Sequence, residues 1–385
     1  MNDNNPAHVK VALLCKGMNI EERVKETLGT SHQEKIYSYS ITDWVNKKVP
    51  FPSEIKLEDR VYVGFHYRPA SIFRLAHVDD YNLAIFKNDE PVVDAALIKR
   101  PSYYSFKSGD GVPLQAIGVS CANHGVSFFI NDYCQYFKEN ENCRFCTLVP
   151  TQQRFNDTLK YKKVDRVDET MAKIIELGDR VDFVQLSGGS LYDHDGEVRN
   201  YIQYIETVKK HLESQGLQGR TPVHLTTMPP RDLEILKELK DAGLNTISFD
   251  LECATQQYFE KYCPGKTKSY GYQGMRKALQ EAVNVFGRGN VFTIIIVGIE
   301  PPEVFVSGTH DLISSGVSPT MNVYHHDPLT MKMDVGEPDP DVVIDTIYEI
   351  AKDFRRYSVR PGLLGCAHYD MGHEIRKGFF DDRTR

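Results

Sequence analysis

The chain has 385 residues, of which 41% are hydrophobic and 26% charged, and its formal net charge is −7. That length is enough for a barrel-sized catalytic domain with an accessory region, and the composition is that of an ordinary globular protein. The acidic net charge gives no general attraction to nucleic acid or to an anionic membrane. No segment approaches the roughly 20 apolar residues of a membrane span. The N-terminus lacks the layout of a signal peptide. We therefore expect a cytoplasmic protein that acts on a small molecule, with no nucleic-acid or membrane partner.

Residues 1–110 mix short apolar runs with Pro, Asp and Asn. The runs read VALL, RVYVGF, LAIF and PVVDAALI. Short runs of this kind, bounded by turn-forming residues, are typical of strands. We predict a β-rich accessory domain over residues 1–110, with no motif that indicates a reaction, followed by a second domain over residues 111–385.

From about residue 112 the pattern changes to strands that alternate with helices. The predicted strands cover 125–130, 181–189, 221–228, 246–253, 291–299 and 318–325, and the predicted helices cover 167–178, 197–213, 231–242, 272–286, 303–315 and 340–356. Six βα repeats of this length predict an α/β fold in which a parallel sheet curls into a partial or complete (β/α) barrel of TIM type.

Four of these strands carry polar residues on one face and apolar residues on the other. The polar faces hold Gln185, Ser187, His224, Thr226, Ser248, Asp250, Glu252, Asn322 and Tyr324. A packed barrel interior is filled mainly by branched apolar side chains, so polar inner faces indicate a lined cavity. The alternative is that they are ordinary polar groups at strand ends.

Three of the eight cysteines fall within 13 residues, directly after the first strand of the predicted barrel. Cys134, Cys143 and Cys146 form a C-x8-C-x2-C arrangement. Closely spaced thiols in a reducing compartment suggest a metal site, and thiolates suit iron–sulfur clusters or zinc. Three thiolates leave one iron of a [4Fe–4S] cube open to a chelating substrate. A zinc site with Cys121 or His124 as fourth ligand is the alternative.

The end of this segment resembles the cluster loop of the radical S-adenosylmethionine (SAM) superfamily, whose last two cysteines are spaced C-x-aromatic-C. The first spacing departs from the family pattern, with eight residues in place of the commonest three. The resemblance implies that Cys134, Cys143 and Cys146 hold a [4Fe–4S] cluster and that Phe145 packs beside the adenine of SAM. It covers roughly residues 112–330 and is closest to biotin-synthase-like members.

Two further motifs extend the resemblance. Ser187-Gly188-Gly189-Ser190, at the end of the second barrel strand, resembles the glycine-rich turn whose backbone binds the amino group of SAM. Glycines suit such a turn because a Cβ would block both the close approach of the backbone and the φ values of the turn. Glu252, at the end of the fourth strand, is implied to bind the ribose hydroxyls of SAM. An internal ion pair with a Lys or Arg is the alternative, because a buried acid needs a partner.

The ends of the fifth and sixth strands complete the implied cofactor site. Val297 and Gly298 stand where the family has residues that flank the adenine, and Tyr324 and His325 stand where backbone groups hold the adenine edge. The neighbouring His326 and Asp327 have two interpretations: they contact a metal or the substrate, or they belong to an ordinary polar loop.

Catalytic candidates follow from position. Asp250 lies one layer below Glu252, Tyr324 ends the sixth strand, and Cys366 and His368 belong to a late segment dense in reactive residues. We expect that segment to cap the barrel near the substrate. We therefore expect substrate specificity to lie in the barrel lining and this cap, and not in residues 1–110.

The resemblance implies a radical SAM enzyme. An electron from a flavodoxin- or ferredoxin-type donor would cleave SAM to methionine and a 5′-deoxyadenosyl radical, which would abstract hydrogen from a small-molecule substrate. Cys253 is either an auxiliary cluster ligand or, more simply, a structural thiol. The competing hypothesis for the whole chain is a zinc-stabilised binding protein without enzymatic activity.

Overall fold

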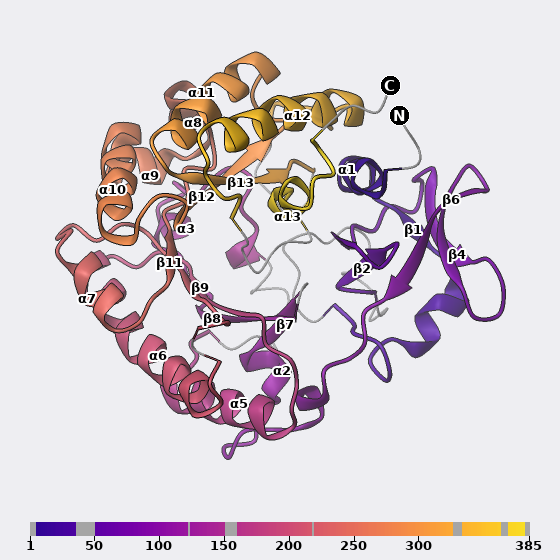
Figure 1. The fold of residues 1–385 in the computed structure, drawn as a ribbon, viewed down its shortest axis with the longest axis horizontal. Helices are drawn as coiled ribbons and strands as arrows, with labels where there is room; N and C mark the ends of the chain where they lie inside the picture. Colours follow the sequence, from indigo (N-terminus) through magenta and orange to yellow (C-terminus); the bar gives the residue numbers. More distant parts are fainter. Residues whose placement is uncertain are drawn as a thin grey trace.

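The computed structural model contains two sheets, with six and seven strands (Figure 1). It describes residues 5–35, 51–121, 124–150, 160–217, 219–325, 333–362 and 369–381. Within these residues, no helix combines the length and the apolar composition needed to cross a bilayer.

The six-stranded sheet lies in the N-terminal region, as the β-rich prediction requires. Its strands, in the order β1-β4-β5-β6-β2-β3, are β1 (Asn19–Ile20), β2 (Glu54–Leu57), β3 (Val61–Gly64), β4 (Phe73–His77), β5 (Leu83–Lys87) and β6 (Glu90–Leu97). All pairs are antiparallel except β1 with β4. The 3₁₀ helix η1 (Glu22–Thr27) packs against β4, whereas η3 (Ser102–Ser105) packs against the helices α2 (Leu114–Ile117) and α5 (Val164–Glu176).

The apolar run VALL does not form a strand. It belongs to helix α1 (Pro6–Lys16), which begins after Asn5, whose side chain accepts a hydrogen bond from the N–H of Ala7. The helix ends at Gly17, which has a φ of 64°. Ten of its eleven residues are buried, so the run lacks the polar face that normally reveals a surface helix.

The seven-stranded sheet forms the second part of the chain. Its strands are β7 (Val119–Cys121), β8 (Gly125–Asn131), β9 (Phe183–Gly188), β10 (Val223–Thr226), β11 (Thr246–Ser248), β12 (Val291–Val297) and β13 (Ser318–Val323). Strands β8 to β13 run parallel in chain order, and β7 pairs antiparallel with β8. This sheet confirms the predicted α/β fold with six parallel strands.

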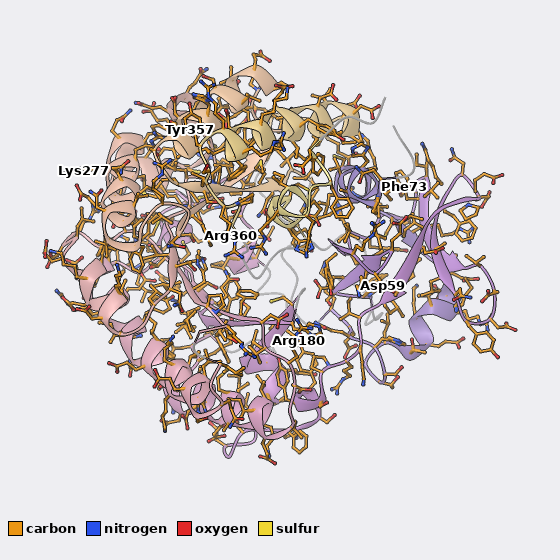
Figure 2. All side chains as sticks on the ribbon, in the orientation of Figure 1. Asp59, Phe73, Arg180, Lys277, Tyr357 and Arg360 are labelled. Atoms are coloured by element: carbon orange, nitrogen blue, oxygen red, sulfur yellow. The ribbon has the colours of Figure 1, made fainter. Side chains whose placement is uncertain are left out.

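Helices cover the outer face of this sheet (Figure 1). This layer includes α5 (Val164–Glu176), α6 (His194–Ser214), α7 (Ile235–Asp241), α10 (Gly271–Phe286), α11 (Pro302–Ser314) and α12 (Pro340–Arg356). The other helices are α2 (Leu114–Ile117), α3 (Gln135–Lys138), α8 (Gln256–Tyr262), α9 (Pro264–Ser269) and α13 (Gly372–Arg376), and α13 lies beside α1. Helices α8 and α9 were not predicted, because they are too short to show a helical period. Side chains fill the space between sheet and helices, and exposed ones such as Lys277 on α10 point outward (Figure 2).

The sheet curls into a partial barrel, and the N-terminal region lies beside its open side (Figure 1). Strands β7 and β13 are the two edges of the sheet. Helix α1 packs against β13 and α12, at one edge. At the other edge, Gln33 Nε2 donates a hydrogen bond of 2.8 Å to the carbonyl of Ser120 on β7. One continuous hydrophobic core includes residues from both parts of the chain.

Polar side chains of the neighbouring strands β9, β10 and β11 contact one another. The hydroxyl of Thr226 lies 3.3 Å from Gln185 Nε2, 3.1 Å from His224 Nε2 and 3.0 Å from the hydroxyl of Ser248. All of these except Thr226 are buried. Much of the polar lining is therefore satisfied by hydrogen bonds between neighbouring strands, so part of it serves the barrel itself.

Candidate functional site

The three clustered cysteines lie in a loop at the carboxyl end of β8. Cys134 precedes α3, and each of the three cysteines is a partly exposed residue. Burial raises the pKa of Cys146, and the nearby thiols of Cys143 and Cys134 raise it further because like charges repel. The pKa of Cys134 is likewise raised by burial and by Cys143. The three thiols therefore influence one another's protonation, and each would release its proton on binding a metal.

The zinc alternative with Cys121 or His124 as fourth ligand is wrong. Both residues lie at the amino end of β8, a seven-residue strand, whereas the cysteine loop follows its carboxyl end. Seven extended residues span roughly 20 Å, far beyond the reach of one metal ion. Among the described residues, no three His, Cys, Asp or Glu side chains are arranged to hold a single metal ion.

The glycine turn after β9 docks directly on the cysteine loop. The N–H of Gln135 donates to the carbonyl of Ser190 at 2.8 Å, and a Cβ on Gly189 would lie 2.1 Å from the carbonyl oxygen of Tyr133. Two backbones can approach this closely only because Gly189 has no side chain. The prediction that the turn needs glycines for their φ values is wrong, since neither Gly188 nor Gly189 has a positive φ.

Two serines of this turn are buried. The hydroxyl of Ser190 lies 3.2 Å from Gln135 Nε2, which is also 3.3 Å from the imidazole of His194. Burial and the nearby Arg231 lower the pKa of His194 to about 4, so that ring is neutral. The hydroxyl of Ser187 has no partner among the described residues. A buried hydroxyl without a partner beside a backbone cradle suits a polar ligand group.

A buried lysine contacts Asp250 and Glu252, the two acidic residues that follow β11. Lys266 Nζ lies 2.8 Å from Glu252 Oε1 and donates to the carbonyl of Asp250 at 2.6 Å. Burial and the neighbouring Glu252 raise the pKa of Asp250 to about 6. Glu252 has a φ of 66°, a strained value for a residue with a side chain. The ion pair that the sequence analysis named as the alternative for Glu252 is present.

Lys266 also lies beside the cysteine loop. The N–H of Gly265 donates to the carbonyl of Glu141 at 2.8 Å, and a Cβ on Gly265 would lie 2.3 Å from the ring of Tyr136. Burial alone would lower the pKa of Lys266, but Glu252 and the Cys143 thiol raise it well above its usual range. Sequence reasoning missed Lys266; the signal was Cys263-Pro264-Gly265-Lys266, where Pro264 occupies the first position of helix α9.

A second thiol group adjoins the loop. The N–H of Arg144 donates to the carbonyl of Tyr262 at 2.9 Å, which places Cys143 next to Cys263. Burial raises the pKa of Cys263, and the neighbouring Cys253 thiol raises it further; both Cys253 and Cys263 are fully buried. The role of Cys253 stays open between ligand and structural thiol.

The ends of β12 and β13 are tied together. The N–H of Tyr324 donates to the carbonyl of Val297 at 2.9 Å. Gly298 has a φ of 102°, and a Cβ there would lie 2.9 Å from Pro338, so this position requires glycine. Burial raises the pKa of Tyr324 to about 12, and its hydroxyl has no partner among the described residues.

Glu300 is a buried carboxylate that the sequence analysis did not single out. It accepts hydrogen bonds from the N–H groups of Ala254 at 2.7 Å and Thr255 at 3.1 Å. Burial raises its pKa in spite of these bonds. Because these contacts link the segments after β11 and β12, Glu300 holds the carboxyl ends of two barrel strands in register.

The remaining predicted residues divide into two groups. Phe145 is partly buried and packs against the core, and His325 is partly exposed after β13. Cys366 and His368 lie outside the described residues, as do His326 and Asp327. The catalytic and cofactor-binding roles predicted for all of these stay predictions.

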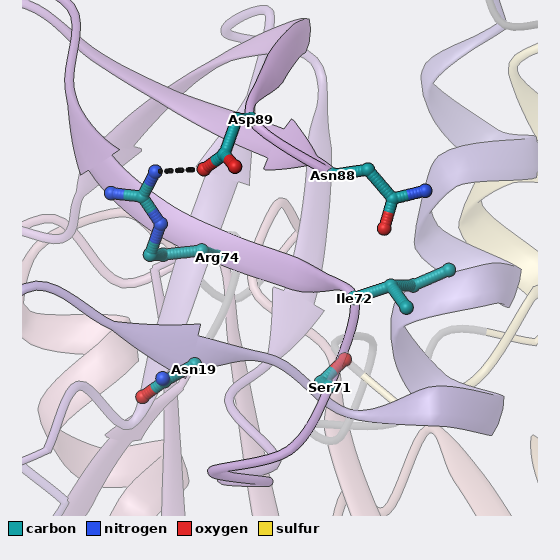
Figure 3. Close-up of a pocket in the computed structure, with 6 residues that line it drawn as sticks. All are labelled: Asn19, Ser71, Ile72, Arg74, Asn88 and Asp89. Carbon is teal, nitrogen blue, oxygen red and sulfur yellow. Dashed lines mark hydrogen bonds and ion pairs between the residues drawn. The ribbon is translucent and has the colours of Figure 1, made fainter.

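A surface hollow of about 240 Å³ lies away from these residues, on the N-terminal sheet (Figure 3). It is lined by Asn19, Ser71, Ile72, Arg74, Asn88 and Asp89. An ion pair of 2.9 Å between Arg74 and Asp89 occupies one side. None of the predicted site residues lines it.

Comparisons with known proteins show which proteins this chain is similar to. Residues 138–306 match the model of the Radical SAM superfamily, a segment that holds Cys143 and Cys146 and begins after Cys134. Bacteriochlorophyllide c C-7(1)-hydroxylase of Chlorobaculum limnaeum is 23% identical over 268 residues, which are 67% of either chain. The solved structure of methylornithine synthase is 13% identical, covers 72% of this chain and 78% of its own, and has a TM-score of 0.46. Coproporphyrinogen III oxidase of Escherichia coli is 14% identical, covers 66% and 57%, and has a TM-score of 0.38.

Proposed function

Because this chain belongs to the radical SAM superfamily and is an enzyme that uses a [4Fe–4S] cluster and SAM, we propose that Cys134, Cys143 and Cys146 hold the cluster. When bound, these cofactors supply reductive cleavage of SAM to a 5′-deoxyadenosyl radical, the species that abstracts hydrogen. The observation that carries the assignment is the docking of the cysteine loop. Its backbone is bonded on one side to the glycine turn at Ser190 and on the other to Gly265.

The residues around that loop fit the binding of SAM. The backbone at Gly189 and Ser190, with the buried hydroxyl of Ser187, suits the amino group of the methionine moiety. Glu252 offers a carboxylate to the ribose hydroxyls, and the ammonium of Lys266 orients that carboxylate and balances negative charge. Both groups lie in a low-dielectric interior, where a charge-assisted hydrogen bond is strong.

The adenine would lie against the ends of β12 and β13. Val297, Gly298, Tyr324 and His325 are the proposed contacts on that side, and Phe145 contributes an aromatic surface from the cysteine loop. Asp250 and Tyr324 are the proposed catalytic groups among the described residues. Both are buried, so water is excluded from the groups nearest the reacting atoms.

The proposed substrate is a small molecule, and the proposed electron donor is a flavodoxin- or ferredoxin-type protein. The curated relative is named for hydroxylation of a bacteriochlorophyllide. Cyclic tetrapyrroles are therefore the first class to screen. The screen measures release of 5′-deoxyadenosine above the background seen without substrate, under anaerobic conditions.

Cysteine substitutions test the proposed ligands. Cys134→Ala, Cys143→Ala and Cys146→Ala should each lower the iron and sulfide content and abolish 5′-deoxyadenosine formation, because a cluster with two protein thiolates is poorly held. Cys121→Ala is the matched control, since that buried thiol lies at the far end of β8.

Two results would contradict the proposal. Full cluster content in Cys134→Ala would show that another thiol, such as Cys263, is the third ligand. Zinc in place of iron and sulfide, after anaerobic purification, would favour the non-enzymatic binding protein.

A further inference from the structure

A group of basic and aromatic side chains lies where the N-terminal region meets the edge of the barrel. We call it the junction cluster, and define it as Lys35, His66, Arg68, His325 and Tyr369. Its members come from four segments far apart in the sequence. Three of them belong to the N-terminal region, for which the sequence indicated no functional role.

Contacts link the cluster into one unit. Lys35 Nζ donates to the carbonyl of Phe65 at 2.9 Å and to the hydroxyl of Tyr369 at 3.3 Å. The ring of Tyr369 stacks on that of His325, with centroids 5.9 Å apart. The ring of His325 lies 4.6 Å from that of His66, so the barrel and the N-terminal region meet through a pair of imidazoles.

The electrostatic character of the cluster is basic. His66 is fully buried, and neither ring nitrogen has a partner in bonding geometry among the described residues, although the backbone of Leu14 lies near. Burial lowers the pKa of His66, and His325, Arg68 and Lys35 lower it further. Arg68 is 3.1 Å from Glu337, which balances part of that charge.

Four members of the cluster, Lys35, Arg68, His325 and Tyr369, are each partly exposed, whereas His66 is fully buried. His325 follows the carboxyl end of β13, and the cysteine loop follows the carboxyl end of β8. Parallel strands end at the same rim of a barrel, and that rim is where barrel enzymes bind substrates. The junction cluster therefore lies at the same end of the barrel as the proposed cluster site.

We propose that the junction cluster binds an anionic group of the substrate, a carboxylate, and so makes the N-terminal region part of the active site. This inference rests on the proposed function and specifies the substrate class. The ammonium of Lys35 and the guanidinium of Arg68 attract an anion and disfavour a metal cation. An arriving carboxylate would also favour the protonated form of a buried imidazole, which supplies a further charge-assisted hydrogen bond.

The test uses full-length protein with ¹⁵N-labelled histidine and acetate as the probe. Sodium acetate is titrated against sodium chloride at equal ionic strength, and imidazole nitrogen resonances are assigned from His66→Gln and His325→Gln. Acetate should shift the ring resonances of His66 and His325 saturably. Lys35→Met should weaken this binding about tenfold or more, since a charge-assisted hydrogen bond is lost. Lys56→Met, on β2, is the matched control and should leave the affinity unchanged.

Several outcomes would overturn the proposal. These are an absence of saturable shifts, equal affinity in the wild type and Lys35→Met, or a response to inorganic phosphate with none to acetate. If His66→Gln does not fold, His325→Gln and Lys35→Met still decide the matter. The titration needs neither iron nor SAM, so it is independent of the test of the proposed function. Acetate binding without SAM cleavage would refute the proposed function alone. SAM cleavage without acetate binding would refute this inference alone.

Discussion

Lys266 connects the two carboxylates after β11 to the cysteine loop. Its ammonium lies 2.8 Å from Glu252, and both side chains are largely buried, so competition from water for this pair is weak. Removing one partner of such a pair leaves an uncompensated buried charge, which is costly. The geometry of Glu252 therefore depends on a residue that follows it by 14 positions.

Substitutions at this pair test the proposed ribose contact. Glu252→Gln should weaken SAM binding roughly 10- to 150-fold, because a charge-assisted hydrogen bond is lost, and Lys266→Met should weaken it in the same direction. Calorimetry on reconstituted protein gives the affinity, and iron content checks that the cluster is intact. Glu260→Gln, at an exposed position on α8, is the control. Unchanged affinity in Glu252→Gln would assign Glu252 to the scaffold.

Among the secondary-structure elements, α1 shows how the N-terminal region is attached. Lys10 on this helix is fully buried, lies 2.9 Å from Glu374 on α13 and donates to the carbonyl of Asp370 at 2.7 Å. Lys10→Met should lower the free energy of unfolding by about 3–5 kcal/mol, because Glu374 would be left buried without a cation. Denaturant unfolding measures this. Lys352→Met, at an exposed pair on α12, should change it little. Equal effects of the two substitutions would refute the argument.

Helix α6 carries a carboxylate with a pH-dependent effect on stability. Glu197 accepts a hydrogen bond from the N–H of Leu191 at 2.9 Å, and burial raises its pKa from 4.5 to about 7. The folded state therefore keeps this proton to higher pH than the unfolded state, so the contribution of Glu197 to stability falls as pH rises from about 4.5 to 7.

Glu197→Gln should remove that dependence. Relative to the wild type, the variant should gain stability with rising pH, by about 3 kcal/mol in total, since one pKa unit corresponds to about 1.4 kcal/mol. Unfolding free energies at pH 5 and pH 7.5 measure the gain. Glu206→Gln, exposed on the same helix, is the control. A constant difference between wild type and Glu197→Gln would contradict the assignment.

At the scale of the whole molecule, the N-terminal region contacts both edges of the partial barrel and shares its core. The expectation that residues 1–110 stand apart from the site gives way to the proposal that they supply the junction cluster. Because the two regions share one continuous core, we expect them to unfold together. Calorimetry should therefore show a single unfolding transition, and a chain without residues 1–110 should fail to fold. Two separate transitions, or a folded truncated chain, would show that the regions are independent.

The sequence by itself determined the αβ pattern and the class of chemistry. The ranges predicted for β8, α5, β12 and α12 agree closely with the structure. The hydrophobic period of a helix or strand depends only on residues that are close together in the sequence, so it can be recognised without the tertiary structure. The cysteine spacing indicated the radical SAM family for an equally local reason. The three cysteines belong to one short loop, so their spacing can be read directly from the sequence.

Only the tertiary structure decided what surrounds those thiols. The contact of Lys266 with Glu252, the meeting of His66 with His325 and the burial of Lys10 against Glu374 each join residues from different elements. The strand β8 likewise separates Cys121 from the cysteine loop, although the two are close in sequence. Periodicity carries no information on such contacts, because they depend on how the sheet curls and on which surfaces the two parts of the chain bury together.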